Sequence, residues 1–255
     1  MGRSQPRPAS WSQARRALDA VVSSSHATQN PFLQRGHKGG WTFGDVRTFG
    51  PEYLHWITAF PGILAKGVSN ARDDDTRAFL TEILFEELGR GRREYRHSNL
   101  FWRFLRDLGV TYFSTTPRLP ETRALIRGMG DLYSHRRVAT MLGAQYALEH
   151  QAVPMIASMF AGVRPLLRDI TRTDIMYFEL HTASEPLHAR VMRRCIARYV
   201  GSPADTSSAL RGARGVLNLI TNFWDALNRH CTNATCLPSQ EEDVAPRGRR
   251  LGRAG

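Results

Sequence analysis

His181, Glu185 and His188 are the residues whose types and spacing best suit metal chemistry in this chain. They lie in a segment, 175–200, whose apolar residues recur with helical spacing. At about 100° per residue, all three side chains fall within about 60° of one another around the helix axis. Two imidazoles and a carboxylate on a common face suit a first-row transition metal. For the trio alone, a chance alignment of histidines on a helix is the competing interpretation.

Two other predicted helices offer partners for this trio. Glu87 and His97 lie in one helical stretch, and Glu149 lies in an apolar part of another. Helical bundles build metal sites from carboxylates and imidazoles that project inward from several helices. A buried, unpaired carboxylate is costly, and a bound metal would remove that cost. The alternatives are a salt bridge to an arginine for Glu149 and a surface position for His97.

These segments together resemble the heme-oxygenase-like diiron oxidases and oxygenases. The resemblance rests on three motifs in order: Glu87-Leu-Gly-Arg-Gly-Arg-Arg-Glu-Tyr-Arg-His97, then Leu148-Glu149, then His181-x3-Glu185-x2-His188. With the Pro31-Phe32 loop and the helix around Phe60-Pro61, the likeness covers about residues 12–230. It implies two Fe(II) ions, with O2 as co-substrate. The metal ligands implied are Glu87, His97, Glu149, His181, Glu185 and His188.

The separation of Glu87 from His97 requires a break in their helix. In a straight helix the two residues would lie about 15 Å apart, whereas two metals in one site lie about 3.5 to 4 Å apart. Gly89 and Gly91 supply such a break. Glu94, which forms an E-x2-H pair with His97, is the alternative to Glu87 and needs no break.

Glu185 departs from the pattern of the family, which usually has Asp at this position. The additional methylene keeps the charge but moves the carboxylate, so direct binding of Glu185 to a metal stays open. Pro186 disfavours an α conformation at Glu185 and removes one helix hydrogen bond. We therefore expect a local kink.

The resemblance implies an O2-dependent non-heme diiron oxidoreductase. Its substrate would be a small amine- or amino-acid-like molecule of specialised metabolism, with N-oxygenation favoured. Oxidative C–C cleavage or desaturation of an amino or fatty acid by the same site is an alternative, as is a metal-free, thiaminase-like or cofactor-binding member of the fold. A heme-degrading enzyme would need a proximal ligand such as His26. An external reductant and a homodimer stay open.

The periodicity predicts an all-α protein, and the resemblance implies a single heme-oxygenase-like bundle of about seven to eight helices. We expect a flexible N-terminus at 1–10, the helical domain at 11–237 and a disordered tail at 238–255. In the second helix, Asp45 is the expected N-cap and Pro61 an expected kink. The predicted helices cover residues 10–25, 45–70, 73–109, 120–134, 137–151, 154–167, 175–200 and 205–229, and residues 28–40 are predicted as a loop.

Composition limits the classes of partner. The 35 Lys and Arg residues against 23 Asp and Glu give a net charge of +12, but they are spread along several helices without a nucleic-acid-binding motif, so we expect no nucleic-acid partner. No apolar run is long enough for a membrane span, and the start of the chain lacks the apolar stretch of a secretory signal. With only three cysteines, a reducing compartment fits. We expect a cytoplasmic protein.

Overall fold

The computed structural model of the chain describes residues 8–111, 113–167 and 174–234, except for the side chains of 8–10, 183–187, 233 and 234. Within these ranges every regular element is a helix, which confirms the all-α prediction. There are nine α-helices here rather than seven or eight, and two 3-10 turns. They are α1 (Pro8–Ser23), α2 (Pro31–His37), α3 (Phe43–Asn70), α4 (Asp74–Glu87), η1 (Arg93–Tyr95), α5 (His97–Asp107), α6 (Pro120–Tyr133), α7 (Val138–Val163), η2 (Arg164–Leu166), α8 (Met176–Ala197) and α9 (Pro203–Ala234).

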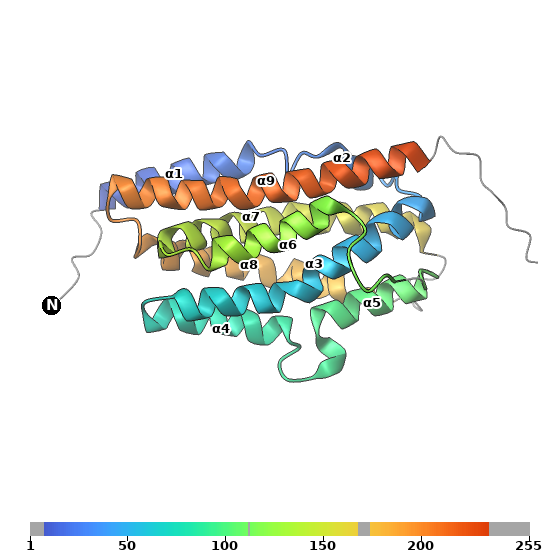
Figure 1. Cartoon of the computed structure of the whole chain (residues 1–255), viewed down its shortest axis with the longest axis horizontal. Helices are drawn as coiled ribbons and strands as arrows, with labels where there is room; N and C mark the ends of the chain where they lie inside the picture. Colours follow the sequence, from blue (N-terminus) through green and yellow to red (C-terminus); the bar gives the residue numbers. More distant parts are fainter. Residues whose placement is uncertain (1–7, 112, 168–173, 235–255) are drawn as a thin grey trace, which may run out of the picture.

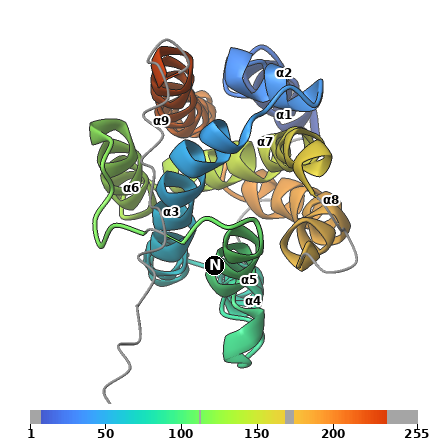
Figure 2. The same cartoon turned by 90° about the vertical axis from the view of Figure 1, so that its right-hand side faces the viewer.

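The helices run mostly along the long axis of the molecule (Figure 1). Viewed end-on, α7 occupies the middle, with α2, α9, α6, α3 and α8 around it (Figure 2). Two glycines let α7 and α9 approach closely. A Cβ at Gly143 would lie 2.0 Å from the Ala209 carbonyl oxygen, and a Cβ at Gly212 would lie 1.8 Å from the Thr140 carbonyl oxygen. None of the helices in the described ranges is long and apolar enough to cross a membrane.

The break predicted before Pro154 is wrong, since α7 runs through this proline from Val138 to Val163. A proline inside a helix costs one hydrogen bond and a steric clash. Around Pro154, the side chains of Ala152, Met155 and Ile156 are buried. Burial of the central helix on several sides thus outweighs the local cost, which the sequence pattern alone could not show.

Two details of the N-terminal half also differ from prediction. The segment predicted as a loop contains α2, whose N-cap Asn30 accepts a hydrogen bond from the Phe32 backbone N–H, with Pro31 in the first turn. The N-cap of α3 is Thr42 rather than Asp45, because Asp45 occupies the third helical position and completes a capping box. Both starts follow ordinary capping chemistry.

The expected break between Glu87 and His97 is present. Helix α4 ends at Glu87, and α5 begins at His97. Gly89, Arg90 and Gly91 between them all have positive φ, at 74°, 52° and 84°. A Cβ at Gly89 would lie 2.3 Å from the Arg92 carbonyl oxygen, so this turn requires glycine there. The chain therefore reverses within a few residues and brings the two helix ends together.

Candidate metal centre

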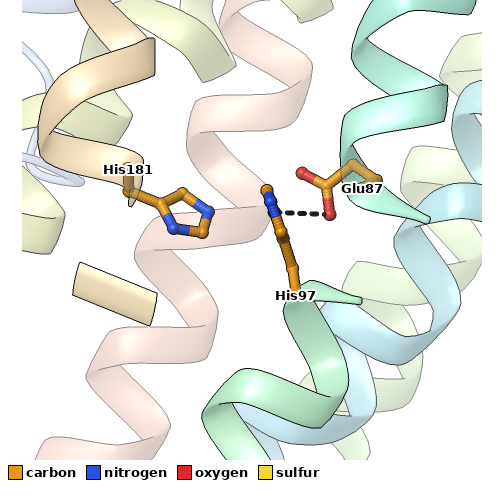
Figure 3. A group of neighbouring side chains, drawn as sticks. All are labelled: Glu87, His97 and His181. Atoms are coloured by element: carbon orange, nitrogen blue, oxygen red, sulfur yellow. Dashed lines mark ion pairs between the residues drawn. The ribbon is translucent and has the colours of Figure 1, made fainter. Parts of the chain in front are cut away.

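Glu87, His97 and His181 converge in the described part of the chain, and one ligand atom from each lies within 4.8 Å of the others. Figure 3 shows the His97 ring between Glu87 and His181. Glu87 is the last residue of α4, His97 is the first of α5, and His181 lies in the second turn of α8. His97 Nδ1 lies 3.1 Å from Glu87 Oε2, and the ring centres of His97 and His181 are 4.6 Å apart.

The chemistry of this cluster fits a metal. His97 Nδ1 is buried and has no hydrogen-bond partner in acceptable geometry. The His181 Nδ1–H donates to the Tyr177 carbonyl oxygen at 2.7 Å, which leaves Nε2 as the lone-pair nitrogen. An orphaned buried nitrogen beside a carboxylate and a second imidazole is costly unless a cation binds there.

Protonation favours the same conclusion. Burial, together with the neighbouring His97, lowers the pKa of His181 to about 4, so its ring is neutral near pH 7. Burial alone would raise the pKa of Glu87, but the imidazoles of His97, His181 and His188 outweigh it and lower that pKa. Metal ligands must be deprotonated, as Glu87 and His181 already are. Burial would lower the pKa of His97, but the carboxylates of Glu87 and Glu86 outweigh it and raise that pKa, so a metal bound there would displace a proton from this ring.

A second group of side chains, formed by Glu86, Glu149 and His188, lies beside the first. His188 Nδ1 lies 3.6 Å from Glu149 Oε2, and His188 Nε2 lies 2.8 Å from Glu86 Oε2. Burial would lower the pKa of His188, but the carboxylates of Glu149 and Glu86 outweigh it and raise that pKa to about 9. The imidazole is therefore held between two carboxylates.

Glu149 is positioned from behind by a hydrogen-bond chain. Gln145 Nε2 donates to Glu149 Oε1, and the Tyr133 hydroxyl donates to Gln145 Oε1. All three residues are buried, with Glu149 only 4% exposed. The chain runs from α6 to α7 and leaves Glu149 Oε2 on the His188 side.

The structure favours Glu87 over Glu94 as the carboxylate of this cluster. Glu94 is 53% exposed and pairs with Arg92 at 3.1 Å, away from the cluster that contains Glu87. Glu185 lies within α8, but its side chain is outside the described residues. Helix α8 continues through Pro186 without interruption. Glu86, which sequence reasoning did not nominate, was signalled only by its position beside Glu87.

A cavity of about 60 Å³ adjoins these groups, which is room for a few water molecules. Glu87, Glu149, His181 and His188 line it, and no Lys or Arg among the described residues does. The rest of its lining comes from Tyr53, Trp56, Ile57, Phe60, Ile83, Leu148, Ala152, Met155, Ile156 and Tyr177. His26, the proximal ligand that a heme enzyme would need, is exposed and lies outside this lining.

Comparison with known proteins identifies the family. The pattern that defines the iron-containing redox enzymes matches residues 47–221, well over half of the chain. The chain belongs to this family. The matched region contains all of the predicted ligands of this redox enzyme, including Glu185.

Two named proteins resemble this redox enzyme over most of its length. The 4-aminobenzoate synthase of Nitrosomonas europaea is 23% identical over 232 residues, which are 86% of this chain and 93% of that protein. The 4-chloro-allylglycine synthase of Streptantibioticus cattleyicolor is 26% identical over 211 residues, which are 82% of this chain and 80% of that protein.

Solved structures show the same fold. A CADD-like protein of unknown function from Nostoc punctiforme has a TM-score of 0.73 at 20% identity, covering 87% of this chain and 98% of its own. A domain with a heme oxygenase-like fold from Shewanella denitrificans has a TM-score of 0.64 at 15% identity, covering 88% and 92%. The predicted heme-oxygenase-like bundle is therefore confirmed for this redox enzyme.

Proposed function

We propose that this chain is a non-heme diiron enzyme that uses O2 to oxidise a small amine- or amino-acid-like substrate, with N-oxygenation favoured. The observation that supports it best is the convergence of Glu87, His97 and His181, with His97 Nδ1 buried and without a hydrogen-bond partner. Glu149 and His188 line the same cavity and complete a second group of ligands. Glu185 is proposed as the sixth ligand from its place in the motif.

Two Fe(II) ions bound by these residues would supply the electrons for oxygen activation, with an external reductant restoring them. The protein's own contribution is to hold His181 neutral and Glu87 ionised, and the small cavity limits the water beside them. Tyr53, Trp56 and Phe60 form one wall of the cavity, where they would contact a substrate placed beside the cluster. The hydroxyls of Tyr53 and Tyr177, 2.7 Å apart, hydrogen-bond to each other at this wall.

The named relatives support an amine-bearing substrate. Both names, 4-aminobenzoate synthase and 4-chloro-allylglycine synthase, denote formation of a molecule that carries an amino group and a carboxylate. This similarity supports oxidation of an amine or amino acid within the same site. A metal-free activity is less well supported, because a buried nitrogen without a hydrogen-bond partner beside the ionised carboxylate of Glu87 suits a cation.

One observation favours a second candidate, the desaturation or C–C cleavage of a fatty acid. The cavity lining is mostly apolar, and no Lys or Arg among the described residues contributes to it. A substrate carboxylate inside it would lack a cationic partner from the protein, which is costly in an apolar setting. The hydrocarbon part of a fatty acid would contact that lining without this cost, provided that its carboxylate stays outside the cavity.

Anaerobic titration with Fe(II), followed by O2 exposure, tests the proposal. Two irons per chain and an O2-dependent absorption band are the expected results. A panel of alkylamines, amino acids and fatty acids of matched length, followed by mass spectrometry, then separates N-oxygenation from desaturation and C–C cleavage. Binding of less than one iron per chain would refute the diiron enzyme.

A further inference from the structure

We propose that Glu86 is a positioning residue that fixes which nitrogen of His188 binds the metal. Its carboxylate holds the Nε2–H of His188 and leaves Nδ1 as the metal ligand beside Glu149. This inference rests on the proposed metal centre. Glu86 precedes the predicted ligand Glu87 in the last turn of α4.

The contact between Glu86 and His188 has the geometry of a strong hydrogen bond. His188 Nε2 and Glu86 Oε2 are 2.8 Å apart, and the side chains are only 11% and 14% exposed. Such bonds between imidazole and carboxylate are short and strong when shielded from water. Once a metal displaces one ring proton, the neutral histidine that still donates from one nitrogen has its lone pair on the other.

The opposite side of the ring has the spacing of a metal site instead. His188 Nδ1 lies 3.6 Å from Glu149 Oε2, which is long for a hydrogen bond. One metal ion with bonds of about 2.1 Å to each atom would span that separation at an angle of about 120°. Glu149 Oε1 is already held by Gln145, so Oε2 is the oxygen directed at the shared position.

Arg90 restricts Glu86 to the positioning role. Its guanidinium pairs with Glu86 Oε1, so each oxygen of this carboxylate has a partner. Arg90 lies between Gly89 and Gly91 with a positive φ of 52°. The same turn that brings His97 back to Glu87 therefore also folds Arg90 over Glu86.

His181 and His188 are consequently expected to bind through different nitrogens. His181 donates from Nδ1 to the Tyr177 carbonyl oxygen, so its Nε2 is the ligand. His188 donates from Nε2 to Glu86, so its Nδ1 is the ligand. The partner of His181 is a neutral carbonyl, whereas the partner of His188 is a charged carboxylate. An anionic partner makes an imidazole more basic, so His188 is expected to be the stronger metal ligand of the two.

The test uses the full chain loaded with Zn(II), a diamagnetic probe, with 15N-labelled histidine. Long-range 1H–15N correlation spectra identify the metal-bound nitrogen of each ring. We expect zinc on Nδ1 for His188 and on Nε2 for His181. Zinc on Nε2 of His188 would overturn the inference.

Variants then separate positioning from simple structural support. Glu86→Gln keeps an acceptor for Nε2–H without the charge, so the nitrogen pattern should persist with weaker zinc binding. Glu86→Ala should lose the pattern and weaken zinc binding at His188 by about 10- to 100-fold, measured by chelator competition. Glu82→Ala, an exposed carboxylate one turn earlier on α4, is the matched control and should change neither.

The outcomes distinguish this inference from the proposed function. Unchanged zinc affinity and nitrogen pattern in a folded Glu86→Ala protein would overturn the positioning role. The expected nitrogen pattern in a protein without O2 reactivity would support the positioning role and refute the oxidase. Failure of the wild-type chain to bind zinc at His188 would overturn both.

Discussion

The two groups of side chains at the candidate metal centre are built from the same side-chain types but differ in how their polar atoms are satisfied. In the open group, formed by Glu87, His97 and His181, two imidazoles share one carboxylate, and His97 Nδ1 has no hydrogen-bond partner. In the closed group, formed by Glu86, Glu149 and His188, one imidazole lies between two carboxylates.

This difference predicts unequal binding of two metals. A cation in the open group removes the cost of a buried orphan nitrogen. A cation must displace a proton in both groups, because neighbouring carboxylates raise the pKa of His97 and raise that of His188 to about 9, but the closed group has no orphan nitrogen whose cost the cation would remove. We therefore expect the first iron to bind in the open group and the second to bind more weakly at neutral pH.

The largest expected effect is that of His181→Ala. It removes one of the two imidazoles of the open group, so iron content should fall from two to at most one per chain, with at least a 100-fold loss of oxidation rate. His188→Ala should leave the tighter iron in place. Iron counting after anaerobic loading measures both variants, and full stoichiometry in His181→Ala would contradict the assignment.

Glu87→Gln and Glu94→Gln form a matched pair at the break between α4 and α5. Glu87 lies in the open group, so loss of its charge should weaken iron binding there by about 100-fold. Glu94 is largely exposed and pairs with Arg92, so its variant should bind iron like the wild type. The opposite ranking in an Fe(II) titration would move the ligand role to Glu94.

How much of this centre is readable from the sequence depends on the range of the interaction. The helical face shared by His181 and His188, and the glycine break before His97, follow from local rules and were predictable. The passage of α7 through Pro154 was not, because it depends on packing against helices distant in sequence.

Glu86 shows a second limit. It and Glu87 are adjacent and chemically identical, and the sequence does not reveal that they serve different histidines. Only the position of α8 against α4 places Glu86 on His188 and Glu87 near His97. Likewise, the 16-residue helix α1 was predictable from its pattern, whereas the seven-residue α2 is too short for a periodic signal.

A smaller effect is expected from the support of the closed group. Gln145→Leu removes the donor to Glu149 Oε1 and the acceptor for the Tyr133 hydroxyl. Binding of the weaker iron should fall by about 10-fold while that of the tighter iron stays unchanged. Ser69→Ala, at an exposed position on α3, is the control. Equal weakening of both irons would show that the two groups are not independent.

The smallest effect concerns the other end of α4, where Asp73 ties the helix to α8. Burial would raise the pKa of Asp73, but hydrogen bonds from Tyr199, Thr76 and Arg198 outweigh it and lower that pKa to about 2. Because the folded pKa lies below the unfolded value of about 3.8, the stabilisation is complete above pH 3.8 and is lost as the pH falls toward 2.

Asp73→Asn tests this anchor. Since the Asp73 side chain is 30% exposed, the free energy of unfolding at pH 7 should fall by about 1 to 2 kcal/mol, less than the full pKa shift implies. The variant should also lose part of its pH dependence between 4 and 2 in urea unfolding. Asp74→Asn, whose side chain is 98% exposed, should cost less than about 0.5 kcal/mol, as surface substitutions usually do. Iron binding of Asp73→Asn should also be measured in both groups. If binding fell equally in both, the position of α4 would matter equally to the open and the closed group, and the difference between the groups would come from their side chains alone.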